Sequence, residues 1–349
     1  MRTLLYGESS IVGSGAWCYA QTLREMGHEV VECDDQGGLE QYRRSTPWRV
    51  FRKLRRGIWE AHRRRHAQLL ADAVRKHRPE ITIILKGLHI SAADVSNLRH
   101  LGTWVVNLNH DDFFSRNPNN WTRIQRGAIP QYDCILTTRE VNLAEIQPIN
   151  PRVRFLGFAY YPRIHRPMVL EPHERQVWAS DVVFVGTWEA ERCRLLEQLV
   201  REVPARYAIY GEQWERVSRH SPLRPYVHRS RLGPDDMAKA IGGAKLALGF
   251  LRKENRDEYT QRSFEIPAYG GLLVAERTAL HCRLYKEGVE AVFFDSNSGD
   301  ELATAVTLLL SDPERREKIR RAGMDALHRQ RHTYEDRMNE LLELYRSSR

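Results

Sequence analysis

The feature that most constrains the fold of this chain is a regular alternation of short β-branched segments with longer amphipathic ones. In the first half, the segments with the composition of buried strands are TLLYG, HEVVECD, ITIILKG, TWVVNLN, DCILTT and RVRFLGF. Helix-like or polar stretches separate them. Strands that alternate with helices pair in parallel, because a crossover between two parallel strands needs about a dozen residues. The alternation therefore predicts an α/β fold.

The same rhythm restarts in the second half after a break. The segment AYYPRIHRPMVLEPHERQ contains three prolines and has no hydrophobic period, as expected of a linker. The strand-like segments DVVFVG, RYAIYG, KLALGF, GGLLVAE and AVFFD follow it. A chain of 349 residues is also too long for one small core. We therefore expect two domains, at residues 1–160 and 179–332, joined by a linker at 161–178 and followed by a helix at 333–349.

Composition excludes several classes of protein. With 42% hydrophobic and 28% charged residues, the chain is neither disordered nor rich in membrane-spanning segments. Its longest apolar runs, such as ITIIL and LALGFL, fall far short of the roughly 20 residues that a spanning helix needs. The start, MRTLLYGESS, has the pattern of a first strand and not of a signal peptide. Five scattered cysteines without a C-x-x-C motif predict neither a disulfide framework nor a metal site.

The positive charge is concentrated in one segment. Between Arg43 and Arg78 the chain has thirteen lysines and arginines against two acids, whereas the whole chain carries a net charge of +9. Apolar residues at helical spacing predict a pair of basic amphipathic helices here. One interpretation is a solvated helical face, and the other is a docking surface for an anionic partner. We expect a cytoplasmic protein whose residues 43–78 contact an anionic inner-membrane surface or an anionic acceptor, but not nucleic acid.

The loop GESSIVGSGAW follows the first expected strand, where a dinucleotide-binding fingerprint would lie. Gly13 and Gly15 match the first two glycines of G-x-G-x-x-G, but Cys18 stands where the third glycine or alanine should be. We therefore interpret the loop as a segment that lines a cleft. NAD binding is not favoured.

A stronger candidate lies at the end of DVVFVG, where Gly186 and Thr187 form a turn before a helix. Free N–H groups and the helix dipole at such a turn suit a diphosphate, and Arg192 could add a bidentate clamp. Any strand-to-helix turn favours Gly and Thr, so a purely structural role stays open. Arg252 and Lys253 after KLALGF are further candidate phosphate contacts.

The stretch DEYTQRSFEIPAYGG pairs two carboxylates eight residues apart, Asp257 and Glu265. Glu265 could accept hydrogen bonds from the vicinal hydroxyls of a ribose, as acids do where nucleotides bind. Asp257 would face the same ligand near the transferred group, or be a solvated side chain. Arg262 either contacts phosphate or braces Glu265, and His165 could swing against the ligand from the linker.

Two further groups of residues complete the candidate site. His110, Asp111 and Asp112 follow the strand TWVVNLN, where one of them could position or deprotonate a hydroxyl of a bound ligand. The alternative is an Asx-type turn that caps the strand end. Tyr210, at the end of RYAIYG, is a candidate for lining a base pocket.

Four segments in the second half resemble a known family: DVVFVGTWEAERCRLLEQL, RLGPDDMAKAIGGAKLALGF, QRSFEIPAYGGLLVAERTAL and EGVEAVFFDSNSGDELA. In that order they resemble the CgeB-like (spore maturation protein) branch of the GT-B glycosyltransferases. The resemblance implies two Rossmann-like domains facing across a cleft, with the nucleotide-sugar donor in the second and the acceptor in the first. It also implies a last helix that crosses back to the first domain, and a reaction that requires neither a metal nor a cofactor.

In many retaining members of the wider superfamily, two glutamates eight residues apart hold the donor. Glu265 matches the second, which grips the ribose. Asp257 lies where the first would be but is one methylene shorter, which leaves its role and the stereochemical outcome open.

We expect a retaining, metal-independent glycosyltransferase that moves a sugar from a nucleoside-diphosphate sugar, such as a UDP-sugar, to an acceptor hydroxyl. The acceptor would be a glycan, a lipid-linked molecule or a protein, as in polysaccharide or cell-surface glycan biosynthesis. Two alternatives stay open. One is a GT-B-shaped protein that binds a nucleotide or glycan without transfer, and the other is a nucleotide-sugar epimerase or an NAD-linked oxidoreductase.

Overall fold

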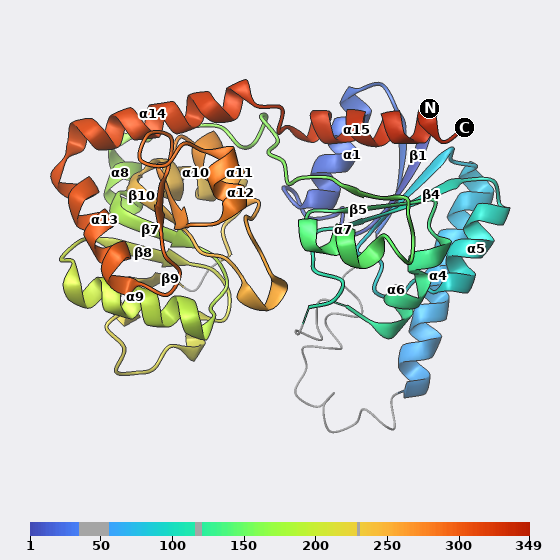
Figure 1. The fold of residues 1–349 in the computed structure, drawn as a ribbon, viewed down its shortest axis with the longest axis horizontal. Coiled ribbons are helices and arrows are strands. Elements are labelled where there is room, and N and C mark those ends of the chain that lie inside the picture. The colour runs from blue at the N-terminus through green and yellow to red at the C-terminus, as the bar shows by residue number, and fades with distance from the viewer. Residues whose placement is uncertain (35–55, 116–120, 229–230) are drawn as a thin grey trace. The chain divides into compact units, whose positions relative to one another are not determined.

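The computed structural model describes residues 1–34, 56–115, 121–228 and 231–349 (Figure 1). The chain divides into two compact units. Unit 1 comprises Met1–Gly157, Lys253–Arg256 and Tyr334–Arg349, and unit 2 comprises Phe158–Arg252 and Asp257–Thr333. The short middle segment of unit 1 therefore comes from the second half of the chain.

Unit 1 is built on a parallel six-stranded sheet with the order β2-β1-β3-β4-β5-β6. Its strands are β1 (Arg2–Tyr6), β2 (Glu29–Cys33), β3 (Ile81–Leu85), β4 (Trp104–Asn109), β5 (Cys134–Thr137) and β6 (Val153–Phe155). The central strands are almost wholly buried, as expected of a parallel sheet covered on both faces. The register pairs Leu4 with Val31 on one side and with Thr82 on the other. This arrangement confirms the predicted α/β layers of the first half.

The helices of unit 1 are α1 (Gly15–Glu25), α4 (Arg56–His77), α5 (Ala92–His100), α6 (Arg123–Ala128), α7 (Glu140–Ile146) and α15 (Tyr334–Ser347), with a 3-10 turn η1 (Ile129–Gln131). Local signals fix several starts. The Ser14 side chain accepts a hydrogen bond from the Trp17 N–H at the start of α1. Helix α15 packs on α1, with the rings of Tyr19 and Tyr334 edge to face and 4.7 Å apart. The last helix thus belongs to the first unit, as predicted.

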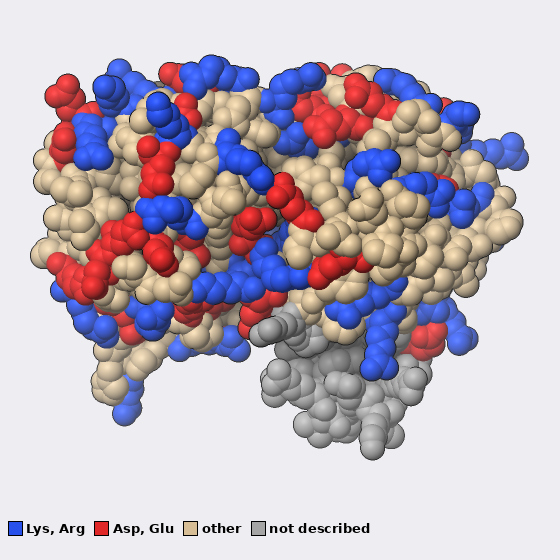
Figure 2. Space-filling view, in the orientation of Figure 1, with Lys and Arg blue, Asp and Glu red and all other residues tan. Residues whose placement is uncertain are grey.

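The basic segment is described only in part. Of residues 43–78, those before Arg56 lie outside the described residues, and from Arg56 to His77 the chain forms the single helix α4. Arg63 on this helix pairs with Glu60 at 2.8 Å and with Asp94 at 2.9 Å. Figure 2 shows basic and acidic side chains interspersed over the face in view. No helix in the described ranges combines the length and apolar character needed to cross a membrane.

Unit 2 has a second parallel six-stranded sheet, with the order β12-β11-β10-β7-β8-β9. Its strands are β7 (Ser180–Val185), β8 (Tyr207–Tyr210), β9 (Val227–His228), β10 (Ala244–Gly249), β11 (Leu273–Glu276) and β12 (Val292–Phe294). Counted from its own first strand, this is the 3-2-1-4-5-6 order of a Rossmann fold. The two-residue edge strand β9 is too short for a periodic signal and was not predicted.

The helices of unit 2 are α8 (Pro172–Trp178), α9 (Ala190–Glu202), α10 (Pro234–Gly242), α11 (Arg262–Ala268), α12 (Ala279–Leu284), α13 (Gly299–Ser311) and α14 (Pro313–Arg329), with 3-10 turns η2 (Trp214–Arg216) and η3 (Arg224–Tyr226). Helices α9 and α13 cover one face of the sheet, and α10 and α11 the other. Helix α8 lies within residues 161–178, the segment expected to be a linker, and the sequence had not predicted a helix there. Pro172 at its first position and a capping box between Glu171 and Glu174 start this helix.

In each unit the strand order reverses between two neighbouring strands. The reversal lies between β1 and β3 in unit 1 and between β7 and β10 in unit 2. Open α/β sheets bind their ligands beyond the carboxyl ends of the strands at such a switch point. In unit 2 these ends lead into Gly186 and Thr187 after β7, and into Phe250 to Arg252 after β10. The candidate site in unit 2 is therefore described from this edge.

Candidate functional site

The turn after β7 is held tightly by its neighbours. The Gly186 N–H donates to the Tyr210 carbonyl at 2.9 Å, and the Trp188 N–H donates to the Glu212 carbonyl at 2.9 Å. A Cβ on Gly186 would lie 2.6 Å from the Phe184 ring, and one on Gly211 would lie 2.1 Å from the Gly186 oxygen. The glycines thus serve close backbone packing. The expectation that the Gly186 N–H is free for a phosphate is wrong, because the neighbouring strand uses it.

Arg192, expected as a phosphate clamp, lies beneath this turn and is only 7% exposed. Its guanidinium donates to the Thr187 carbonyl at 3.1 Å and to the Phe250 carbonyl at 3.5 Å, and pairs with Glu189 at 3.4 Å. Burial lowers the pKa of Arg192, and the Glu189 carboxylate opposes that shift. Arg192 therefore braces the loops after β7 and β10 against each other.

Arg252, in the loop after β10, is a cation at this edge that retains access to solvent. Its side chain is 34% exposed, and its Nε atom lies 2.6 Å from Oε1 of Glu189. The Arg252 N–H donates to the Asp257 carboxylate at 3.3 Å, and the Asp257 N–H donates back to the Arg252 carbonyl at 3.3 Å. This reciprocal pair closes a turn of six residues and places the Asp257 carboxylate beside the Arg252 backbone.

Glu265 lies on the first turn of α11 and is 4% exposed. Its Oε2 atom accepts a hydrogen bond from Arg262, and its Oε1 atom lies 3.4 Å from Nε2 of His165. Arg262 also donates to the carbonyl of Val185, the last residue of β7, at 3.4 Å. Of the two roles considered for Arg262, the structure shows the brace for Glu265. The carboxylate is thus fixed near the switch point.

His165 does not point away from the site as a free linker residue would. Burial lowers its pKa to about 3, with a further contribution from the Arg262 charge, so the ring is neutral. The Tyr161 N–H donates to its Nδ1 atom at 2.9 Å. The ring proton must therefore be on Nε2, which is the atom that faces Glu265. The expected swinging histidine is instead packed in place, edge to face with Tyr269.

A buried chain of hydrogen bonds, which sequence reasoning missed, supports the start of α11. Ser263 Oγ lies 2.8 Å from Nε2 of His281, whose Nδ1 lies 2.7 Å from the Glu276 carbonyl. Burial lowers the pKa of His281 to about 4, so Nδ1 carries the proton of a neutral ring and Nε2 accepts from Ser263. The Tyr285 hydroxyl donates to the Ser263 carbonyl at 2.8 Å. No sequence pattern links these residues, because they come from three separate elements.

Tyr210 is 5% exposed and belongs to the core of unit 2. Its ring stacks on His228 of β9 at 4.7 Å and lies 5.9 Å from the ring of Trp178 on α8. Tyr210 was expected to line a base pocket, but protein side chains already cover its ring. Burial raises the pKa of its hydroxyl.

In unit 1, His110 and Asp111 lie beyond the carboxyl end of β4. Nε2 of His110 lies 3.1 Å from the Tyr19 hydroxyl, and burial lowers the pKa of His110 to about 4. Asp111 pairs with Lys86 at 2.6 Å. Lys86 itself has a φ of +58° after β3, at the switch point of this sheet. His110 is thus a neutral imidazole and Asp111 a partly exposed carboxylate.

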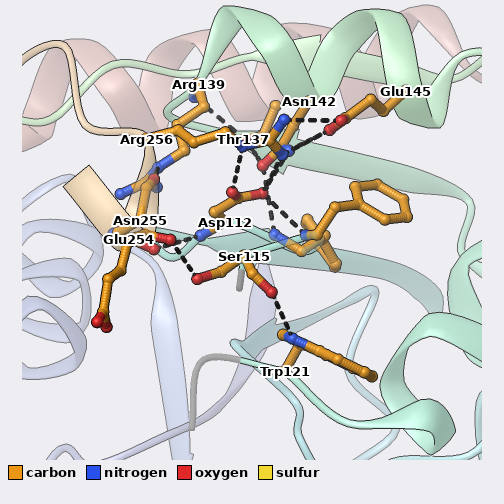
Figure 3. Close-up of polar contacts among 12 residues, drawn as sticks. Asp112, Ser115, Trp121, Thr137, Arg139, Asn142, Glu145, Glu254, Asn255 and Arg256 are labelled. Atoms are coloured by element: carbon orange, nitrogen blue, oxygen red, sulfur yellow. Dashed lines mark hydrogen bonds and ion pairs between the residues drawn. The ribbon is translucent and has the colours of Figure 1, made fainter. Parts of the chain in front are cut away.

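Asp112 is fully buried and engaged on both oxygens (Figure 3). Arg256 donates to its Oδ2 atom at 2.5 Å and to its Oδ1 atom at 2.6 Å. Asn142 and the Phe114 N–H each donate to Oδ1 at 2.8 Å. Burial opposes the charge of Asp112, but these hydrogen bonds outweigh burial and hold its pKa below its usual range. The geometry favours an anchoring role over that of a base.

Lys253, expected as a phosphate contact, lies in the 3-10 turn η4 (Lys253–Asn255). Its side chain is exposed, and the turn belongs to unit 1. The other donor candidates, Arg252 and Glu265, belong to unit 2. All five cysteines are free thiols, and within the described ranges no cluster of three or more His, Cys, Asp or Glu side chains could hold a metal ion.

Residues 191–343 match the model of a family described as glycosyl transferase-like. The match begins in α9, ends in α15 and includes the turn at 252–257 and Glu265. No curated protein sequence gives a significant match to the chain.

Solved structures match the chain over nearly its whole length. A sucrose-phosphate synthase from Thermosynechococcus elongatus is 12% identical, with a TM-score of 0.71 over 99% of this chain and 98% of its own. A glycosyltransferase from Rickettsia africae is 12% identical, with a TM-score of 0.65 over 99% and 98%. The Anabaena protein HepE in complex with UDP and glucose is 12% identical, with a TM-score of 0.68 over 99% and 100%. The chain therefore has the fold of the GT-B glycosyltransferases.

Proposed function

We propose that this protein is a glycosyltransferase that moves a sugar from a nucleoside-diphosphate sugar to an acceptor hydroxyl. The observation that carries the proposal is the buried carboxylate of Glu265, fixed between Arg262 and His165 beside the switch point of a Rossmann-ordered sheet. The GT-B fold and the glycosyl transferase-like family match over 191–343 support it. The CgeB-like branch, suggested by the sequence segments, is part of the proposal.

The ribose is assigned to Glu265. A buried carboxylate is costly unless its charge is paired, and Arg262 provides that pairing from within the same helix. The neutral His165 ring adds one donor without adding charge. Two vicinal hydroxyls would donate to the remaining lone pairs of the two carboxylate oxygens.

The diphosphate is assigned to the loops that follow β7 and β10. Arg252 is a partly exposed cation there, and binding would draw it from Glu189 onto the phosphates. The thirteen-residue helix α9 starts next to the same turn and adds the positive end of its dipole. The Gly186 N–H already donates to the Tyr210 carbonyl, so it is not assigned to the diphosphate. The turn would instead let the diphosphate approach the close-packed backbone at Gly186 and offer it the Thr187 side chain. Arg252 and the dipole are the positive groups that a metal-independent reaction would use.

In the proposed reaction the bond between the anomeric carbon and the diphosphate oxygen breaks, and the acceptor oxygen bonds to that carbon. The leaving diphosphate takes the electron pair, so preorganised positive charge at its oxygens lowers the barrier. Asp257 is assigned to the sugar, which it contacts or orients. The outcome is proposed to be retention, following the carboxylate pair of the wider superfamily.

The acceptor hydroxyl is assigned to unit 1, and it loses its proton in the reaction. The neutral imidazole of His110 and the carboxylate of Asp111 are the candidate bases, since Asp112 is engaged by Arg256. The acceptor class is a glycan, a lipid-linked molecule or a protein. Contact of the basic helix α4 with an anionic membrane or acceptor is also proposed, supported by Arg64 and Leu69, which are 74% (side chain) and 50% exposed.

Calorimetric titration with UDP, GDP, ADP and TDP, each with and without a chelator, tests the donor assignment. We expect one nucleotide to bind selectively, without added metal, and to lose binding in Glu265→Ala. The matched control is Glu287→Ala, an exposed glutamate of unit 2 that pairs with Arg277. If no nucleotide binds the unmodified protein, or if Glu265→Ala binds as the control does, the ribose assignment fails.

A further inference from the structure

The segment Lys253–Arg256 joins two donor candidates, Arg252 and Asp257, yet it belongs to the other unit. It follows β10 of unit 2 along the chain and is counted with the body of unit 1. It ends on Arg256, whose φ of +49° lies in the left-handed region. Side chains with a Cβ seldom adopt this conformation unless the surroundings fix it, and such residues gather at functional sites.

Two carboxylates fix Arg256. Its guanidinium donates to both oxygens of Asp112, at 2.5 and 2.6 Å, and to both oxygens of Glu145, at 2.7 and 2.8 Å (Figure 3). Asn142 lies between the two acids and donates to each of them, at 2.8 and 2.9 Å. The planar guanidinium suits such double bidentate pairing, which a lysine could not reproduce.

The rest of the segment is held as well, residue by residue. The Asp112 N–H donates to the Asn255 side-chain oxygen at 2.9 Å, and Arg139 donates to the Asn255 carbonyl at 2.8 Å. The Ser115 hydroxyl donates to the Glu254 carbonyl at 2.5 Å. Three consecutive residues are therefore pinned to unit 1 by the loop after β4 and by the region around α7.

The pinned segment fixes the ends of the turn in which it lies. Two hydrogen bonds of 3.3 Å join Arg252 and Asp257, one donated by each backbone N–H to the other residue. With the four residues between them, these bonds form a closed ring. If Arg256 were released, the ring could open, and both flanking side chains would lose their orientation. No residue of the pinned segment needs to touch a ligand for this effect.

We infer that Arg256 is a positioning residue: its pairing with Asp112 and Glu145 sets the 252–257 turn, and thereby the placement of Arg252 and Asp257 on the sugar diphosphate. The inference rests on the proposed function for the identity of the ligand, but not for the state of the turn. It also gives Asp112 a role, as the anchor of Arg256.

Hydrogen exchange without ligand tests the state of the turn. In Arg256→Met we expect the amides of Arg252 and Asp257 to exchange about tenfold faster or more, while the strands of both units stay protected. The matched control is Arg277→Met, because Arg277 also pairs with two glutamates and its side chain is 37% exposed, against 35% for Arg256. Unchanged exchange in Arg256→Met, or equal loss of protection throughout unit 1, would overturn the inference.

Donor kinetics on the same variants test the consequence for the ligand. We expect Arg256→Met to raise the KM for the nucleotide sugar about tenfold, with a smaller change in the KM for the acceptor, and Arg256→Lys to recover part of the loss. An unchanged donor KM, or an equal effect in Arg277→Met, contradicts the inference. If Arg256→Met does not fold, Glu145→Gln takes its place as the test variant, because it removes the charge of the partly exposed partner of Arg256. Failure of the unmodified protein to bind any nucleotide would instead reject the proposed function, and exchange would still decide whether Arg256 sets the turn.

Discussion

Asp112 in unit 1 and Glu265 in unit 2 are both deeply buried carboxylates paired with an arginine, and they differ in how completely they are satisfied. Asp112 in unit 1 accepts four hydrogen bonds, two of them from one guanidinium. Glu265 in unit 2 has two partners in the described part of the chain, Arg262 and the more distant His165. A saturated carboxylate can only anchor, whereas one with lone pairs left can also bind a ligand. The comparison separates a structural acid from a binding acid.

The largest expected effect is on the stability of unit 1. Asp112→Asn leaves Arg256 without its buried partner and should lower the free energy of unfolding by about 3 kcal/mol. Denaturant unfolding followed by tryptophan fluorescence would measure it. Glu265→Gln should cost less, about 1 kcal/mol, because Glu265 has two partners where Asp112 accepts four hydrogen bonds. Equal losses in the two variants would erase the distinction between anchor and ligand-binding acid.

The next effect is on ligand affinity and falls on the other carboxylate. Glu265→Gln should weaken nucleotide binding by roughly 100-fold, since two hydrogen bonds to a charged group are replaced by weaker ones. Calorimetry on the variant and on Glu287→Gln, its exposed control, would measure this. Binding within about threefold of the unmodified protein would mean that Glu265 is another structural acid.

Much of the fold behind this comparison could be predicted from sequence. Buried strands such as ITIIL and DVVFVG have an unmistakable β-branched composition, and their alternation with helices fixes a parallel sheet. The Asp257 and Glu265 pair was identified because both acids lie within fifteen consecutive residues. Two elements were not predicted. The edge strand β9 has only two residues, and the prolines around helix α8 suggested a linker.

The partners of the site residues could not be predicted, because they are set by tertiary packing. Arg256 and Asp112 are 144 residues apart, and no period in the sequence connects them. Nothing local distinguishes Arg192, which braces two carbonyls, from Arg252, which stays partly exposed. The Gly186 N–H was expected to be free because a glycine turn can offer its N–H to a ligand, but the neighbouring strand uses it. Spacing in the sequence identified the candidate residues. Tertiary packing decided which of their polar groups already bind a protein partner.

A third effect concerns pH, and it arises from the buried histidine that supports α11. The folded pKa of His281 is about 4, whereas its unperturbed value is 6.5. Between these values the unfolded chain binds more protons, so the stability contributed by His281 is complete above about pH 6.5 and decreases toward pH 4. At pH 5 the loss from His281 should be about 2 kcal/mol.

Urea unfolding between pH 7 and pH 5 would measure this loss. His281→Asn, whose amide can still donate to the Glu276 carbonyl, should show a shallower decline with pH than the unmodified protein. His165 acts in the same direction, because its pKa is lowered to about 3. Asp112 adds little to the change in this range, because its usual pKa of 3.8 and its lowered folded pKa both lie below pH 5. A decline of the same slope in His281→Asn would show that this ring is not held neutral.

The smallest effect is expected at an arginine that pairs with carboxylates on the surface. Arg277 contacts Glu287 and Glu301 at 2.7 Å each, and all three side chains are more than a third exposed. Arg277→Met should therefore change the free energy of unfolding by less than about 1 kcal/mol. Thermal unfolding at low and at high salt would measure it. If Arg277→Met lowered the free energy of unfolding as much as Asp112→Asn, burial would not be what determines how much such a pair stabilises the fold.

The central claim is that the protein transfers a sugar from a nucleoside diphosphate, and nucleotide release tests it most directly. We would incubate the protein with UDP-sugars in the presence of a chelator, without acceptor, and quantify free UDP and the sugar by chromatography. We predict slow release of UDP and free sugar from one donor, absent in Glu265→Gln. Conversion of the sugar without release of UDP would indicate an epimerase, and binding without any turnover, even when acceptors are added, would indicate a protein that only binds. Either result would contradict the account.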